Sequence, residues 1–68
     1  MSHVAKIIEV VGSSDKSWED AADRAVSTAS KTVSGIQGVQ VQSMTGKVTD
    51  GKITTFKTTI KVSFGVEH

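Results

Sequence analysis

The chain has 68 residues, no cysteine and a formal net charge of +1, so it has room for one domain with a modest core. Chains this small usually need disulfides, metals or oligomerisation for stability, and the lack of cysteine excludes disulfides and thiolate metal sites. Charges of both signs are scattered, and neither a long apolar run nor a secretory signal pattern occurs, so we expect no nucleic-acid or membrane partner. Self-association is the means of stabilisation that remains, and the lack of cysteine is compatible with the cytoplasmic location that we expect.

The first half of the chain predicts a strand followed by an amphipathic helix. Residues 4–11 are rich in Val and Ile, which favour a strand, and a Gly-Ser stretch ends it. The helix is predicted over Ser17–Ser34, with Ser17 as its N-cap and Asp20 as a weaker capping-box partner. Gly35 suits a left-handed C-cap. Apolar residues recur at helical spacing at Trp18, Ala21, Ala22, Ala25, Val26, Ala29 and Val33.

The remaining half predicts a long β-hairpin. Ile36–Val48 and Lys52–Phe64 flank Asp50-Gly51, a strong signal for a two-residue turn. The last strand alternates, with its apolar face at Phe56, Thr58, Ile60, Val62 and Phe64. The middle strand changes phase near Ser43–Gly46, which predicts a bulge or a bend with Gly46 as its natural place.

The lengths of these elements predict an incomplete monomer. A helix of this predicted length is ~27 Å long, whereas each strand of the hairpin is ~43 Å long. The hairpin must therefore extend beyond the helix, and the chain has no other element to cover its apolar residues. We expect those residues to be buried between subunits.

The motifs that fill these elements resemble those of the dodecin family, in register over nearly the whole chain. They are V-x-K-x-I-E-V-V-G-S-S, S-W-E-D-A, A-S-K-T-V, D-G-K-I and K-V-S-F. The resemblance implies one α+β domain over residues 1–68, a βαββ subunit whose three-stranded antiparallel sheet packs on one helix. Dodecins form hollow twelve-subunit shells, and many bind stacked pairs of flavins between subunits. The implied role is storage, buffering or quenching.

The positions that hold flavin in that family are changed here. The family motif I-x-W-x-x-V, whose Trp stacks on the isoalloxazine ring, reads I-Q-G-V-Q-V, so Gly38 replaces the Trp. Lys57 stands where a Gln hydrogen-bonds the pyrimidine edge. Thr45 precedes Gly46, where some members carry an Arg. Gly38, Thr45 and Lys57 are therefore the candidate ligand-site residues.

Two interpretations of these changes stay open. In one, flavin binding is weakened or lost, and the shell binds a divalent cation, as a calcium-binding type of dodecin does, or is purely structural. In the other, riboflavin or FMN still binds, held by Lys57, Gln40 and backbone groups. Lys57 would suit an acidic ligand such as a phosphorylated flavin.

Other features favour structural roles. Trp18 is expected to be a partly buried packing anchor, and the terminal His3 and His68 are expected to be solvated. The acidic residues near the helix start complement the helix dipole, and a metal site there would need several subunits because no EF-hand spacing occurs. They are Asp15, Glu19, Asp20 and Asp23. No catalytic triad, carboxylate pair or HExxH motif occurs, so we expect no enzyme activity.

Overall fold

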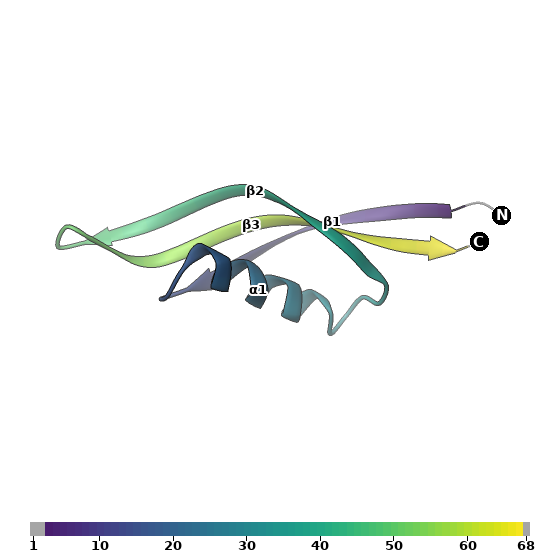
Figure 1. The fold of residues 1–68 in the computed structure, drawn as a ribbon, viewed down its shortest axis with the longest axis horizontal. Coiled ribbons are helices and arrows are strands. Elements are labelled where there is room, and N and C mark those ends of the chain that lie inside the picture. Colours follow the sequence, from purple (N-terminus) through teal and green to yellow (C-terminus); the bar gives the residue numbers. More distant parts are fainter. Residues whose placement is uncertain (1–2, 68) are drawn as a thin grey trace.

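The computed structural model describes residues 3–67, and it describes the side chains of residues 4–65. Its elements follow the predicted order of strand, helix and long hairpin (Figure 1). They are β1 (His3–Ser14), α1 (Trp18–Ala29), β2 (Ile36–Thr49) and β3 (Lys52–Glu67). The strands form one antiparallel sheet in the order β1-β3-β2, which confirms the βαββ architecture.

The hairpin between β2 and β3 turns at Asp50 and Gly51, whose φ angles are +52° and +76°. A two-residue type I′ turn needs positive φ at both central residues, and Asp-Gly is among the pairs that adopt it most readily. The turn therefore forms where the sequence predicts it. Because β3 pairs with both β1 and β2, it is the central strand of the sheet.

The core lies between α1 and the middle of β3. Buried and more exposed positions alternate along β3, with Thr58, Ile60 and Val62 fully buried, which confirms the predicted period of two. Ala25 of α1 packs on this cluster, between the buried Ala21 and Ala29. We call the side of the sheet that carries these β3 residues the helix face and the opposite side the open face.

Close contact between α1 and β1 depends on Gly12. A Cβ atom at Gly12 would lie 1.9 Å from the carbonyl oxygen of Ala21, closer than any real contact. The lack of a side chain at this point, together with alanines on the helix, allows the two backbones to approach. The cost is that this contact buries little apolar area.

The helix ends at Ala29 and not at Ser34, so the predicted end is wrong by more than a turn. Ser30 is the C-cap, and its hydroxyl donates to the carbonyl of Val26. The hydroxyl of Thr32 donates to the carbonyl of Ala29. Ser and Thr compete for backbone groups in this way, which ends the helix early. Gly35 has the left-handed φ of +74°, but in the loop after the helix rather than at its C-cap.

The irregularity of β2 is real, but its predicted place at Gly46 is wrong. Gly46 pairs in register with Phe56, and the register shift falls between Val41 and Ser43. The extra residue, Gln42, puts Met44 on the same face as Val41, which explains the change of phase in the sequence. Two further shifts lie near the ends of the strand, between Ile36 and Gly38 and between Lys47 and Val48.

The hairpin extends well beyond the helix, as the predicted lengths required (Figure 1). The molecule is 55 Å long, whereas the 12 residues of α1 span only ~18 Å. Among the described residues, eight large apolar side chains are exposed: Val4, Ile7, Val11, Val39, Val41, Met44, Val48 and Ile53. Those of the hairpin are not covered by α1, whereas Ile7 and Val11 of β1 lie on the open face. Within the described residues, no helix is long and apolar enough to cross a bilayer.

Candidate functional site

The three candidate site residues fall into two separate places on one subunit. Thr45 and Lys57 are direct cross-strand partners on β2 and β3, on the open face of the sheet. Gly38 instead partners Ser63. Lys57 and Ser63 are separated along β3 by ~20 Å at the usual rise per strand residue. A ligand that touches all three positions would have to use more than one subunit.

Thr45 and Lys57 line an open groove of about 350 Å³ near the hairpin end. Its other lining residues are Gly46, Lys47 and Thr55. We call it the hairpin groove. Two ammonium groups and two hydroxyls give it a basic, hydrogen-bonding lining, and among the described residues no Asp or Glu lines it. The groove therefore offers donors to a ligand but no carboxylate that could bind a cation.

Gly38 lies in a second groove of about 290 Å³, also lined by Ile7, Val39, Gln40, Lys61 and Ser63. A Cβ atom at Gly38 would meet only the hydroxyl of Ser63, at an ordinary 3.6 Å. The glycine is therefore not required by packing within the subunit, and a large side chain would fit there. No aromatic residue is among those lining either groove in the described part of the chain.

The back of the hairpin groove is held by Trp18, at the start of α1. The indole Nε1 donates a hydrogen bond of 2.8 Å to the carbonyl oxygen of Thr45. The ring also meets Phe56 edge-on, with centroids 4.8 Å apart and an interplanar angle of 84°. The hydroxyl of Thr58 donates to the Trp18 carbonyl at 2.8 Å. One residue of the helix thus contacts both strands of the hairpin.

These contacts confirm Trp18 as a partly buried packing anchor, and they show the role of Gly46. A Cβ atom at Gly46 would lie 3.5 Å from Cζ2 of Trp18 and 3.1 Å from Cγ2 of Ile53. The glycine therefore gives the indole room against β2. Sequence reasoning assigned Gly46 to a bulge and missed this contact, because the spacing of Trp18 and Gly46 gives no sign that they meet.

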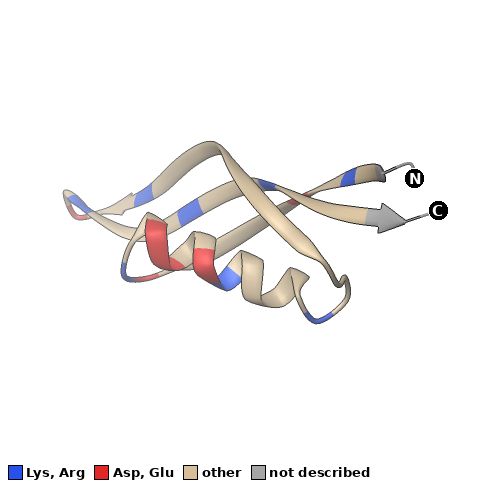
Figure 2. Cartoon of the chain, turned by 45° about the vertical axis from the view of Figure 1, so that its right-hand side comes forward, with Lys and Arg blue, Asp and Glu red and all other residues tan. Residues whose placement is uncertain are grey.

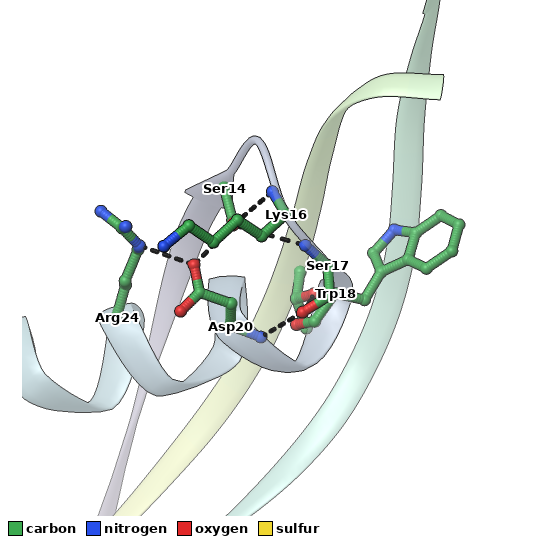
Figure 3. Close-up of polar contacts among 7 residues, drawn as sticks. Ser14, Lys16, Ser17, Trp18, Asp20 and Arg24 are labelled. Carbon is green, nitrogen blue, oxygen red and sulfur yellow. Dashed lines mark hydrogen bonds and ion pairs between the residues drawn. The ribbon is translucent and has the colours of Figure 1, made fainter. Parts of the chain in front are cut away.

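Polar side chains at the helix start are arranged around the carboxylate of Asp20 (Figure 3). Asp20 accepts hydrogen bonds from the Ser14 hydroxyl at 2.5 Å and from Nε of Arg24 at 2.8 Å. These two bonds hold the pKa of Asp20 below its ordinary value, and the carboxylate in turn raises the pKa of Arg24. Ser17 is the N-cap, as predicted, and accepts a bond from the Asp20 amide.

Within one subunit this arrangement stabilises the start of the helix. The Asp20 carboxylate bonds to Ser14 and Arg24, so only half of the predicted capping box forms. Over the described part of the chain, no three His, Cys, Asp or Glu side chains are grouped so that they could hold a metal ion. His68 and the side chain of His3 lie outside that part.

Charges of both signs occur on the subunit, but they are unevenly distributed (Figure 2). Acidic residues gather on the first half of α1, whereas Lys residues are spread along the hairpin strands. The two places that could attract an ion are thus of opposite sign: the helix start suits a cation and the hairpin groove an anion.

A model of the family described as Dodecin matches residues 4–67. The chain belongs to the dodecin family. The dodecin from Streptomyces davaonensis is 25% identical and superimposes with a TM-score of 0.92 over 100% of both chains. The dodecin from Streptomyces coelicolor is 29% identical, with a TM-score of 0.90 over 97% of this chain and 94% of that one.

A third solved dodecin is described by its chemistry. It is the calcium-chelating immunodominant antigen, calcium dodecin, from Mycobacterium tuberculosis, with a novel calcium-binding site. It is 37% identical to this chain, with a TM-score of 0.80 over 94% of this chain and 91% of that one. A search of curated proteins finds no match. The family is one that binds small ligands such as flavins, and the similar structures include a calcium-binding member.

Proposed function

We propose that this dodecin forms a hollow homododecameric shell that binds small ligands without catalysing a reaction, and that its flavin binding is weakened or lost. The observation that carries the proposal is the open groove at Gly38, which lacks any aromatic ring. Storage in the cytoplasm is the proposed role, and the chain has no cysteine and hence no disulfide that a reducing compartment would break.

The aromatic residues of this chain are used elsewhere. There are three, and Trp18 and Phe56 pack against each other at the helix start. Phe64 partners Ile36 on β2, on the helix face of the sheet rather than in the groove. Stacking on an aromatic residue is worth about 1 kcal/mol beyond the area buried. A flavin in the Gly38 groove would lack that contribution.

The second changed position acts in the same direction. A glutamine amide both donates and accepts hydrogen bonds, as the pyrimidine edge of a flavin requires, whereas the ammonium of Lys57 only donates. In one subunit Lys57 also lies far from Gly38. The isoalloxazine ring would therefore lose both the residue that stacks on it and the residue that orients its edge.

Assembly is supported by the exposed apolar residues of the hairpin and of β1. Val39, Val41 and Met44 lie on the helix face, yet α1 does not cover them, and they are 45–57% exposed. Continuous apolar surface of this kind marks an interface. Light scattering on a sizing column should give a mass near twelve subunits at neutral pH. A monodisperse monomer would contradict the shell.

Ligand binding is tested by titrating riboflavin and following its fluorescence. We expect weak binding with little quenching by the unmodified protein. Gly38→Trp with Lys57→Gln should recover much of the affinity, and either single change should recover less, because one residue stacks and the other orients. The control is Gly38→Leu, which fills the same open space without a ring. Tight riboflavin binding by the unmodified protein would overturn the weakened-flavin proposal.

Calcium binding is a second candidate, favoured by the similarity to calcium dodecin and by the acidic first half of α1. Asp15, Glu19 and Asp23 are exposed there, and a site would combine them from several subunits. Calorimetric titration of the chelator-treated shell with Ca²⁺ tests it. Binding that is lost in Glu19→Gln but kept in Glu9→Gln, a carboxylate on β1, would support it. Absence of heat at millimolar Ca²⁺ would exclude it.

A further inference from the structure

We propose that the hairpin groove is an oxyanion site, which takes the phosphate group of an anionic ligand between Lys47 and Lys57. The inference rests on the proposed ligand-binding function and specifies the chemical class of ligand that the hairpin groove binds. It depends only on residues of a single subunit, because both lysines line the same groove.

The register of the hairpin brings the two lysines together. Thr45 is the cross-strand partner of Lys57, and Lys47 is the partner of Thr55, so all four residues lie on the open face in two adjacent rows. Lys47 and Lys57 are diagonal neighbours, whose backbones in such a pair are about 7–8 Å apart. Two long ammonium side chains at that spacing can both reach an anion that lies between them. A phosphate, with several acceptor oxygens, can bond to both.

The neighbouring lysine on β3 shows the difference that a carboxylate makes. Lys61 lines the Gly38 groove and has Glu9 of β1 as its direct cross-strand partner. Lys57 has Ser13 as its partner on β1 and Thr45 on β2. The charge of Lys61 is thus opposed locally, whereas the field of Lys57 adds to that of Lys47. An anion would therefore prefer the hairpin groove.

The rest of the lining completes the same chemistry. The hydroxyls of Thr45 and Thr55 can each donate a hydrogen bond, so the groove presents two charged and two neutral donor groups. Hydrogen bonds from charged donors to phosphate oxygens are among the stronger ones in proteins. The pyrimidine edge of a flavin needs acceptors as well as donors, so it fits the hairpin groove less well than a phosphate does.

Contacts from the start of α1, on the helix face, also fix the shape of the groove. Trp18 bonds to the carbonyl of Thr45 and packs on Phe56, the residue before Lys57. Binding to such a fixed hairpin requires less ordering of the backbone than binding to a free one. Because Trp18 is the one tryptophan of the chain, its emission also reports on the groove.

The test titrates the assembled protein with pyrophosphate, following Trp18 emission and heat. We expect saturable binding that weakens as salt is raised. Lys57→Gln and Lys47→Gln should each raise the Kd about tenfold or more, since each removes a charged hydrogen-bond donor. The matched control, Lys61→Gln, removes an equal charge from the same strand and should leave the Kd nearly unchanged. Equal effects of all three changes would show a diffuse charge effect and overturn the site.

Riboflavin and FMN distinguish a free anion from a phosphate carried on a larger molecule. They share the ring and differ in the phosphate group. FMN binding that exceeds riboflavin binding and disappears in Lys57→Gln would place a ring-borne phosphate in the groove. Pyrophosphate binding with no preference for FMN would indicate a free anion. The same substitution should help riboflavin and harm the phosphate ligands, which separates the two functions of this position.

The inference and the proposed function can fail separately. A dodecamer that shows no response to pyrophosphate or FMN would overturn the anion site and leave the shell intact. A monomer that binds pyrophosphate through Lys47 and Lys57 would overturn the shell and support the site, because the groove is complete in one chain.

Discussion

Where α1 lies on the sheet, β3 buries Thr58, Ile60 and Val62 completely, whereas the neighbouring strand β2 has no buried side chain. The cross-strand partners show the contrast directly: Ile60 is 0% exposed and its partner Val41 is 45% exposed. Both residues point to the same face of the sheet. The difference is that the helix covers β1 and β3 but is too narrow to cover β2. The subunit is therefore a small core joined to an uncovered hairpin.

The two halves of the subunit therefore have different roles, one in the stability of the single chain and the other in binding. The covered half stabilises the single chain, with an alanine-faced helix and a central strand. The hairpin half carries the basic groove and five of the eight exposed apolar residues, and the other three are on β1. Trp18 joins the two, because it starts the helix and bonds to the hairpin. Substitutions on either side of that junction should have effects of different kinds.

The largest expected effect is in the covered half. Ile60→Ala should lower the free energy of unfolding by about 2–5 kcal/mol, because it removes most of a fully buried side chain from the core. Denaturant unfolding monitored by circular dichroism measures it. A loss below 1 kcal/mol would mean that the core between α1 and β3 contributes little to stability.

Trp18 tests the junction. Trp18→Ala should cost about 3 kcal/mol, at the lower end for loss of a large aromatic side chain, because Trp18 is only partly buried. Trp18→Phe keeps a ring on Phe56 but loses the bond to the Thr45 carbonyl, so it should cost only about 1 kcal/mol. Thermal unfolding measures both. An unchanged midpoint in Trp18→Ala would show that helix and hairpin are not coupled through it.

Val41 tests what covers the hairpin. In an isolated subunit Val41→Ala should change stability by no more than about 0.5 kcal/mol, because the residue is a surface position there. In the proposed shell it is buried between subunits, so Val41→Asp should shift the mass measured by light scattering towards smaller species. Lys52→Asp, a charge change at the hairpin tip, is the control. A full-size Val41→Asp shell would place the interface elsewhere.

The smallest expected effect concerns the acidic helix start. Because hydrogen bonds from Ser14 and Arg24 lower the pKa of Asp20 in the folded state, its charged form stabilises the fold above the ordinary pKa. That contribution is lost as the pH falls through the lowered pKa, in the range below about pH 4. In Asp20→Asn, the free energy of unfolding should therefore fall less steeply as the pH is lowered below about 4. Asp23→Asn is the matched control. The same pH dependence of the free energy of unfolding in Asp20→Asn and in the unmodified protein would contradict this role.

Much of the fold could be predicted from the sequence, because its signals are local. Asp50-Gly51 determines the turn through its own backbone preferences, and Ser17 caps the helix that follows it. The alternation in β3 identifies its buried face. Family motifs then led to the dodecin assignment, which the family match confirms. Each of these depends on neighbours in the chain.

What only the tertiary structure decided depends on residues far apart in the chain. The bulge at Gln42 follows from pairing with β3. The early end of α1 is the exception, because it follows from local bonds of Ser30 and Thr32 to the last turn. The sequence identified Gly38, Thr45 and Lys57 as site positions, but only the register separates Gly38 from the other two and adds Lys47 beside Lys57. Gly46 faces Trp18 because α1 lies against the hairpin. Periodicity specifies the face of an element, whereas packing specifies what that face meets.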